Sequence, residues 1–374
     1  MPIKLQEIKR RKDFKKFVRY TFDLYKDNQY WIPPIIKGEL DVLLPGRNPA
    51  FEHCDAIYVL ALKNGKVVGR IAGIINHLCN RSSGKLQARF GWFDFEDDEE
   101  VSTSLIRFIE NWALNEGMNE LIGPIGFTTF DRQGLLVEGF DQLPTIASTY
   151  NYSYYAKHIE QHGYEKQTDY LEFEIKTPDK IPEKPTQIIN IIKNKYRLTP
   201  LHAKSRKELI SYADQVFHVI NESYKEILGF VPLTQKQCKF FIKKYFSVIH
   251  PNFTTAVLDQ NEKMVGFQIA MPSLSRAFQK ANGKLFPFGI VHIIKAIKNP
   301  ERVDVLLVGV LPEFQRKGVN AFFFSELAKA CIQKNIRFAE SNGLLEENLK
   351  IQNFLRYVEA KLHKRRRLYY KTLQ

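Results

Sequence analysis

The first half of the chain alternates between strand-like and helix-like patterns of apolar residues. Two alternating stretches, 58–62 and 67–75, flank the dipeptide Asn64-Gly65, which is a strong short-range signal for a β-hairpin. Residues 102–115 repeat apolar positions at helical spacing, and Gly117 follows them as the expected helix end. The other elements predicted in this half are strands at 3–8, 88–95, 121–125 and 170–175, and helices at 12–25 and 154–162.

The second half repeats this order of elements. A hairpin is predicted over 255–258 and 264–271, followed by an almost continuously apolar strand at 303–311 and a helix at 319–334. Further strands are predicted at 198–202, 338–340 and 367–372, and further helices at 207–224 and 348–359. A repeat of this length indicates duplicated domains and not a solenoid of short units. The predicted fold class is α/β, with two tandem domains that each contain a twisted, mostly antiparallel sheet flanked by helices.

Three prolines within eight residues separate the two halves. Pro178, Pro182 and Pro185 favour a semi-rigid connection between domains. We therefore divide the chain into a first domain at 1–178, a Pro-rich linker at 179–194 and a second domain at 195–374. The length of 374 residues agrees with this division, because domains have about 150 residues on average.

Composition and charge narrow the class of protein. Hydrophobic residues make up 44% of the chain and charged residues 26%, as expected of a soluble globular protein. The net charge of +14 favours anionic partners, namely a nucleotide diphosphate, a phospholipid surface or nucleic acid. We interpret the basic run 361–367 as a solvated turn before the last strand. The four cysteines lie far apart without a C-x-x-C pair, so we expect neither a metal site nor a disulfide framework.

Two further patterns are missing from the sequence. The N-terminus has no apolar stretch after its basic residues, and no segment approaches the ~20 apolar residues of a membrane-spanning helix, so we expect a cytoplasmic protein. No zinc-finger, helix-turn-helix or RNA-recognition pattern accompanies the positive charge, so we do not expect specific binding of nucleic acid.

The loop at 312–321 carries the most specific candidate chemistry. It connects the predicted strand 303–311 to the helix 319–334. Amide groups at the start of a helix have no intrahelical partner and attract phosphate oxygens. Gly318 allows a close approach of the backbone to a ligand, while Arg316 and Lys317 add positive charge. The pattern predicts a binding site for a pyrophosphate group.

This loop resembles the pyrophosphate-binding loop of the GNAT acyltransferase superfamily, Q/R-x-x-G-x-G/A. Gln315, Lys317 and Gly318 match the pattern, whereas Asn320 replaces its usual Gly or Ala and Ala321 follows one residue later. The resemblance implies acetyl-CoA or a longer acyl-CoA as the acyl donor and an amine as the acceptor. The residues that it implies for carrier binding are Val308, Gly309, Val310, Gln315, Arg316, Lys317, Gly318, Val319, Asn320 and Ala321.

Segments outside this loop are similar to a bacterial group of tandem GNAT proteins. The similar segments are 91–96, 123–126, 134–140, 150–155 and 229–234. Some members of this group accompany sphingolipid-synthesis enzymes, which implies N-acylation of a long-chain or lipid-like amine. The first half has the acidic run 96–100 in place of the carrier-binding loop, and these carboxylates would repel a pyrophosphate. We therefore expect the first domain to be degenerate for CoA binding and to have a structural or acceptor-binding role.

Direct transfer to an amine requires a proton acceptor for the ammonium group and a proton donor for the leaving thiolate. The resemblance suggests Tyr357 as the acid. Glu340 and Glu222 are candidate bases, and each is alternatively a structural or surface carboxylate. Two other functions stay open: a non-catalytic module that binds acyl-CoA or lipid, and an aminoacyl-tRNA-dependent transferase.

The stretch 283–297 is an unusually apolar insertion before the strand at 303–311. Three interpretations stay open for it. The segment lines an acyl-chain pocket, rests on the inner membrane face with Lys295 and Lys298 near lipid phosphates, or covers the sheet as a core helix.

Overall fold

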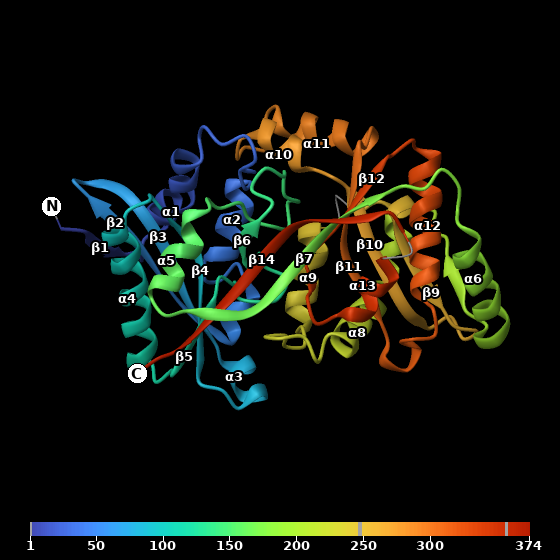
Figure 1. The fold of residues 1–374 in the computed structure, drawn as a ribbon, viewed down its shortest axis with the longest axis horizontal. Coiled ribbons are helices and arrows are strands. Elements are labelled where there is room, and N and C mark those ends of the chain that lie inside the picture. The colour runs from blue at the N-terminus through green and yellow to red at the C-terminus, as the bar shows by residue number, and fades with distance from the viewer. Residues whose placement is uncertain (1, 246–248, 356–357) are drawn as a thin grey trace.

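The described residues form a single sheet of fourteen strands that extends through both halves of the chain (Figure 1). The computed structural model describes residues 2–245, 249–355 and 358–374. The strand order is β1-β2-β3-β4-β5-β14-β7-β12-β11-β10-β9-β8, with β6 paired to β14 and β13 paired to β7. Only the pairs β4–β5 and β11–β12 are parallel among the described strands, and they occupy equivalent places in the two halves. The mixed, mostly antiparallel sheet with flanking helices confirms the predicted fold class.

The first half contributes seven strands and five helices to the described structure. They are β1 (Lys4–Glu7), α1 (Arg11–Leu24), α2 (Ile36–Leu43), β2 (Cys54–Lys63), β3 (Lys66–Asn76), α3 (His77–Ser83), β4 (Gln87–Phe95), α4 (Glu99–Asn115), β5 (Glu120–Gly123), β6 (Leu135–Glu138), α5 (Tyr154–Gln161) and β7 (Glu165–Lys176). The predicted hairpin 58–75 is confirmed as β2 and β3. The core of the first half contains Phe95, Leu105 and Ile109, which pack between the sheet and α4.

The second half contains the remaining elements. They are α6 (Glu183–Tyr196), β8 (Thr199–Leu201), α7 (Arg206–Ser211), α8 (Ala213–Ser223), α9 (Gln235–Tyr245), β9 (Thr254–Leu258), β10 (Met264–Pro272), α10 (Ser275–Ala281), α11 (Gly289–Lys298), β11 (Arg302–Val310), α12 (Asn320–Gln333), β12 (Phe338–Ser341), β13 (Leu344–Leu345), α13 (Leu349–Leu355) and β14 (Ala360–Thr372). The predicted strand and helix on either side of the 312–321 loop are confirmed as β11 and α12. The single helix predicted at 207–224 is instead divided into α7 and α8 at Tyr212.

The last strand of the chain belongs to both halves. β14 lies between β5 and β7 of the first half, and β7 pairs on its other side with β12 of the second (Figure 1). The division at residue 178 therefore does not separate the strands into two sheets. The segment 179–194 also differs from the expected linker, because α6 begins at Glu183 and packs against α12. Pro182 and Pro185 lie at the start of this helix, where a missing N–H costs little.

The basic run 361–367 is part of β14, so its interpretation as a solvated turn is wrong. Lys364 is 1% exposed and Arg366 is 2% exposed. The Lys364 ammonium pairs with Glu340 and lies 3.4 Å from Glu172 Oε2. Arg366 Nε donates to Glu172 Oε1 at 2.6 Å. Two buried cations therefore face two buried carboxylates in the middle of the sheet.

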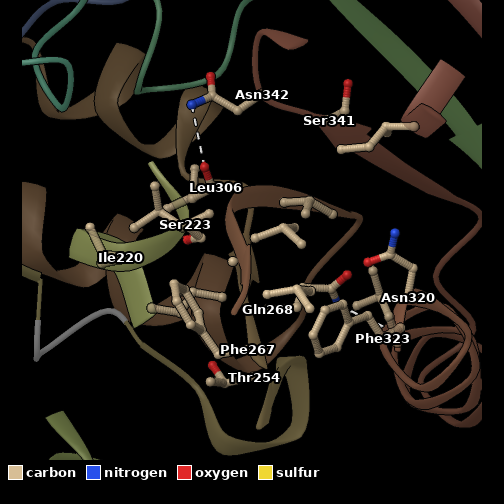
Figure 2. A pocket seen from close by; sticks show the side chains of 18 of the residues that line it. Ile220, Ser223, Thr254, Phe267, Gln268, Leu306, Asn320, Phe323, Ser341 and Asn342 are labelled. Carbon is tan, nitrogen blue, oxygen red and sulfur yellow. Dashed lines mark hydrogen bonds between the residues drawn. The ribbon is translucent and has the colours of Figure 1, made fainter. Parts of the chain in front are cut away.

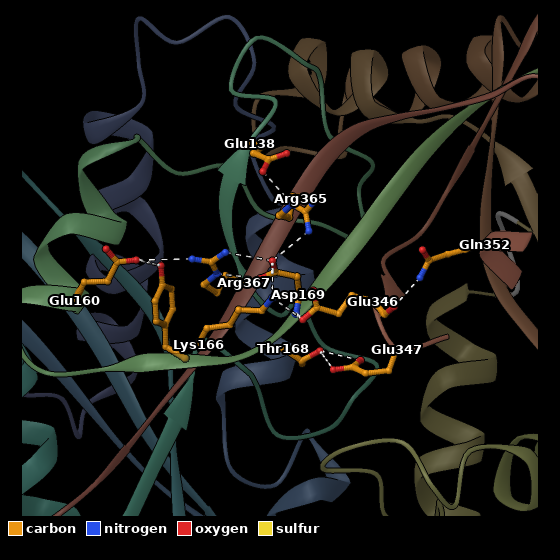
Figure 3. A network of polar contacts seen from close by, with 11 residues as sticks. Glu138, Glu160, Lys166, Thr168, Asp169, Glu346, Glu347, Gln352, Arg365 and Arg367 are labelled. Carbon is orange, nitrogen blue, oxygen red and sulfur yellow. Dashed lines mark hydrogen bonds and ion pairs between the residues drawn. The ribbon is translucent and has the colours of Figure 1, made fainter. Parts of the chain in front are cut away.

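The neighbouring arginines of β14 point to the opposite face, because side chains alternate along a strand. Arg367 Nε donates to Asp169 Oδ1 at 2.9 Å, and Arg365 Nη1 donates to Asp169 Oδ2 at 3.2 Å (Figure 3). Asp169 also lies 3.2 Å from Lys166 Nζ, and its amide donates to Glu346 at 3.0 Å. This network ties β7 and β14 to the segment before α13.

Substitution of Lys364 tests the importance of the buried ion pairs. Lys364→Ala leaves two carboxylates buried without their shared cation, and we expect a loss of about 3–5 kcal/mol in the free energy of unfolding. The control Lys361→Ala removes an exposed lysine of the same strand and is expected to change stability by less than about 0.5 kcal/mol. Urea denaturation measures both values, and equal stabilities of the two variants would contradict the assignment.

We expect the buried carboxyl group of Asp304 in β11 to make the free energy of unfolding depend on pH. This fully buried carboxyl lies beside Glu340 in the sheet register, and burial together with the Glu340 charge raises its pKa to about 8. Because the folded state holds the proton more tightly than the unfolded state, Asp304 lowers stability as the pH rises from about 4 to about 8. Asp304→Asn removes this contribution.

We expect the stability difference between Asp304→Asn and the wild type to grow in favour of the variant across this pH range. The difference should exceed about 1 kcal/mol at pH 8, since one pKa unit corresponds to about 1.4 kcal/mol. Urea denaturation at several pH values measures it, and parallel pH profiles would refute the prediction.

Candidate active site

A cavity of about 1040 Å³ opens where β11 and β12 part (Figure 2). β12 pairs with β11 only from Phe338 opposite Arg302 to Ser341 opposite Val305, while β11 continues to Val310. The walls come from α8, α9, β10, β11, β12 and the start of α12. Phe130, Ser148 and Tyr170 of the first half close one end. The cavity is therefore built from both halves of the chain.

The open edge of β11 presents backbone groups to this cavity. Leu311 N donates to Val265 O at 2.9 Å, which sets the hydrogen-bonding register with β10. In this register Gly309 exchanges hydrogen bonds with Phe267, so Val308 and Val310 turn their N–H and C=O groups away from β10.

Side chains donate hydrogen bonds to three backbone carbonyl groups along this edge of β11. The Tyr224 hydroxyl donates to Val308 O at 3.1 Å, Gln315 Nε2 donates to Val310 O at 3.3 Å, and Asn342 Nδ2 donates to Leu306 O at 3.4 Å. The N–H groups of Val308 and Val310 point to the same edge, along which the described structure places no strand. They can donate to the carbonyl groups of an extended ligand.

The loop after β11 forms a second group of donors. Arg316 has a φ of 62° and Gly318 a φ of 85°, whereas Val319 is right-handed at φ −52° and ψ −34°. Within the described residues, no acceptor lies opposite the amides of Arg316, Gly318, Val319 and Asn320. Consecutive amides in this conformation create a concave anion site, and α12 adds the positive end of its dipole. The loop therefore fits a phosphate group.

The structure brings the residues predicted for carrier binding together, with one exception. Those that line the cavity are Val308, Gly309, Val310, Gln315, Arg316, Gly318, Val319, Asn320 and Ala321. Lys317 instead places its ammonium 4.9 Å from the ring centres of both Tyr196 and Phe314. The contact of these residues with a carrier stays a prediction.

Helix α6 covers the glycine of the loop. A Cβ atom added to Gly318 would lie 2.8 Å from Ile192 Cδ1 and 2.9 Å from Ile188 Cγ2. The positive φ favours glycine at position 318, and any larger side chain would also have to displace these two isoleucine side chains. The segment that the sequence suggested as a linker thus forms one wall of the candidate site.

The predicted catalytic carboxylates do not line the cavity. Glu340 is 2% exposed and pairs with Lys364 and with Arg302 Nη1, the latter at 3.1 Å. Burial acts to raise its pKa, but His363 and Lys364 lower it to about 2. Glu222 lies on the surface and pairs with Lys225 at 2.7 Å. These geometries favour structural roles for both, and Tyr357 lies outside the described residues.

Tyr224 is a cavity residue that sequence reasoning missed. Burial raises the pKa of its hydroxyl to about 12, so the hydroxyl keeps its proton at neutral pH. Its ring stacks on Phe130 of the first half, with centroids 6.1 Å apart and planes at 14°. Helical spacing in the sequence could have indicated this residue. Ile220 and Ser223 of α8, and Tyr224 directly after it, lie toward the cavity, whereas Glu222 lies on the opposite face.

In the first half, the protein's own groups fill the place that corresponds to the loop and the open strand edge of the second half. Asp98 Oδ1 accepts from Glu100 N at 2.9 Å and so caps α4, while Asp98 Oδ2 pairs with Lys63 at 2.7 Å. Beside the open end of β4, Ile125 N donates to Phe90 O at 2.8 Å. A carboxylate and a loop thus fill the positions where the second half offers free donors, which favours the second half as the carrier site.

Two curated bacterial proteins are similar to this chain over nearly its whole length. No family model matches the chain. It is 28% identical over 369 residues to protein YghO of Escherichia coli, covering 96% of this chain and 93% of the relative. It is 26% identical over 372 residues to a bacterial ceramide synthase of Caulobacter vibrioides, covering 96% and 95%.

Solved structures extend the comparison to the fold. A tandem GNAT protein from the clavulanic acid biosynthesis pathway superposes with a TM-score of 0.59 at 10% identity, covering 100% of this chain and 99% of that one. A probable N-acyltransferase from Enterococcus faecalis superposes with a TM-score of 0.52 at 10% identity, covering 100% and 73%. The chain therefore has the fold of the tandem GNAT proteins, as its loop and its order of elements predicted.

Proposed function

We propose that this chain is an acyl-CoA-dependent N-acyltransferase that acylates an amine, of a long-chain or lipid-like class. One observation carries the proposal: the open edge of β11 leads directly into the loop of unpaired amides, and both border one large cavity. Such an arrangement suits a ligand with a phosphate group at one end and an extended chain of amide groups. An acyl-CoA has this chemistry.

Each part of the site has a stated task in this proposal. The amides of Gly318, Val319 and Asn320 bind the pyrophosphate, and the Arg316 guanidinium adds charge. The N–H groups of Val308 and Val310 hold the amide-bearing arm of the carrier against the edge of β11. The thioester then lies in the cavity near Tyr224, whose hydroxyl is at the same edge.

The other end of the cavity suits the acceptor. Its lining is mainly apolar, but Asp131, Ser148 and Glu172 provide polar groups at the first-half end. The Asp131 carboxylate can attract an ammonium group, whereas Glu172 already pairs with Lys364 and Arg366. The apolar walls accommodate a long chain. The ceramide synthase among the relatives supports a lipid amine as the acceptor class. The first half thus takes the acceptor-binding role.

The transfer step needs no covalent intermediate with the protein. The amine nitrogen attacks the thioester carbonyl carbon, a C–N bond forms, and the C–S bond breaks. Tyr224 donates its hydroxyl proton to the leaving thiolate and recovers a proton, through solvent, from the amine nitrogen. The site therefore uses binding, orientation and one proton donor.

Loss of the loop geometry should abolish binding of the carrier. Gly318→Glu places a carboxylate in the anion site and a side chain against Ile188 and Ile192, so we expect no measurable binding of acetyl-CoA by calorimetry. Arg316→Ala preserves the packing and should weaken binding about ten-fold, the effect of one charge-assisted contact. Lys317→Ala, whose side chain does not line the cavity, is the matched control. Normal binding by Gly318→Glu would refute the carrier site.

A parallel activity assay separates the enzyme from a non-catalytic binding module. The proposal predicts release of free thiol when a long-chain acyl-CoA is mixed with a long-chain amine. Tight acyl-CoA binding without turnover on any amine would instead favour the binding module. Native mass spectrometry of the chain from its own cells would read the acyl length directly.

Removal of the Tyr224 hydroxyl tests the proton donor. Tyr224→Phe should lower kcat about 100-fold with little change in the KM for acyl-CoA, since general acid catalysis contributes at least about 100-fold. Tyr212→Phe removes another cavity-lining hydroxyl and should retain activity. Steady-state kinetics of both variants distinguish catalysis from a general effect on the cavity. Equal kcat values for the two variants would exclude Tyr224 as the acid.

A further inference from the structure

Exposed apolar side chains gather on and before helix α11. Phe286 is 70% exposed, Phe288 75%, Val291 58% and Ile294 45%. These four residues, here called the α11 patch, lie within nine positions of the sequence. Large aromatic side chains with this exposure are unusual on a protein that faces only water, because contiguous apolar surface marks an interaction site. Helix α11 lies at the upper margin of the molecule in Figure 1.

Helix α11 has two faces of different character. Ile293, Ala296 and Ile297 belong to a hydrophobic cluster that also contains Leu306 and Ile146. The outward face carries Val291 and Ile294 together with the exposed Lys295 and Lys298. The inward face confirms part of the core-helix interpretation, whereas residues 283–297 do not line the described cavity. No element among the described residues covers the outward face, since Val291 and Ile294 are exposed.

The segment that contains the α11 patch is positively charged. Residues 273–300 contain five basic residues and no acidic one. These basic residues are Arg276, Lys280, Lys284, Lys295 and Lys298, and all are exposed. None of them has an ion-pair partner in the part of the chain that the structure describes. Exposed apolar side chains together with nearby cations that have no ion-pair partner among the described residues match the surface of an anionic bilayer, with acyl chains beneath a layer of phosphates.

We propose that the α11 patch docks onto the surface of an anionic lipid bilayer. Phe286 and Phe288 insert between the lipid head groups, α11 lies parallel to the surface, and the surrounding lysines contact lipid phosphates. Helix α11 has ten residues and is therefore about 15 Å long, half of the ~30 Å hydrocarbon core. No helix within the described ranges has the length and apolar character to cross a bilayer. The contact is thus peripheral.

Docking would bring the cavity close to the membrane. Leu306 and Ile146 belong to the same hydrophobic cluster as Ile293 of α11, and both also line the cavity. One hydrophobic cluster therefore connects the docked helix to the wall of the candidate active site. If the acceptor is a lipid amine, a point that rests on the proposed function, docking shortens its path from the bilayer. Docking itself does not depend on that function.

Vesicle co-sedimentation of the full chain tests this proposal. We expect the wild type to sediment with vesicles of equimolar phosphatidylcholine and phosphatidylglycerol, and to bind less to phosphatidylcholine alone. Added salt should weaken the binding, since it screens the lysines. Phe286→Ser with Phe288→Ser should lower the partition coefficient about ten-fold or more, because two aromatic side chains no longer leave water. Lys295→Gln with Lys298→Gln should reduce binding to the anionic vesicles only.

Two control variants accompany these changes. Leu86→Ser replaces another exposed apolar residue, which is 52% exposed and outside the patch. Lys239→Gln with Lys243→Gln removes two exposed lysines from α9. Both controls should bind vesicles like the wild type. Circular dichroism checks that the Phe286→Ser and Phe288→Ser protein is folded, which we expect because both side chains are exposed.

Three outcomes would overturn the proposal. The wild type does not sediment with anionic vesicles, the phenylalanine variant binds them as well as the wild type, or the control variants lose binding to the same extent. Analytical ultracentrifugation distinguishes another occupant: a dimer that the phenylalanine variant abolishes, without vesicle binding, identifies a second copy of the chain. Acetyl-CoA binding is measured on each variant, so a failure of docking is distinguished from a failure of the carrier site.

Discussion

The pairing of β14 with β7 is the interaction on which the rest of the structure depends. It joins the last strand of the chain to the last strand of the first half, so that fourteen strands form one sheet. At its centre Lys364 and Arg366 face Glu172 and Glu340 in a buried, mutually compensating group. Burying four such charges is costly unless each has its partner. The observed register of β14 brings these partners together, so the charges favour this way of joining the halves.

This joining creates the cavity. β7 lies between β14 and β12, and thus holds the first half against the open side of β11. The first half then contributes Phe130, Ser148 and Tyr170 to the cavity wall. A single GNAT-like half would leave β11 and its neighbouring helices exposed to solvent at this point. The buried charges of the sheet are therefore coupled to the shape of the candidate active site, although none of them performs the proposed chemistry.

Local patterns predicted the elements well, because hairpins, apolar strands and amphipathic helices depend on neighbouring residues. The β2–β3 hairpin and the β11–loop–α12 unit are examples. The basic run of β14 was misread, because the partners of Lys364 lie 192 and 24 positions away in the sequence and a charge run alone does not reveal them. The prolines before α6 were likewise ambiguous, since they suit a linker and the first turn of a helix equally.

In the candidate site, too, features that depend on neighbouring residues were predicted from the sequence, whereas those that depend on the folded structure were not. The residues predicted for carrier binding share one loop and one strand, so their spacing was enough to group them. The catalytic candidates were chosen by residue type, and strand alternation places Ser341 on the cavity side where Glu340 was expected. Tyr224 lies two positions after Glu222 and on the correct face of α8. Side-chain direction, once the helix and strand phases are known, therefore identifies the hydroxyl group that we propose as the proton donor, which residue type alone does not.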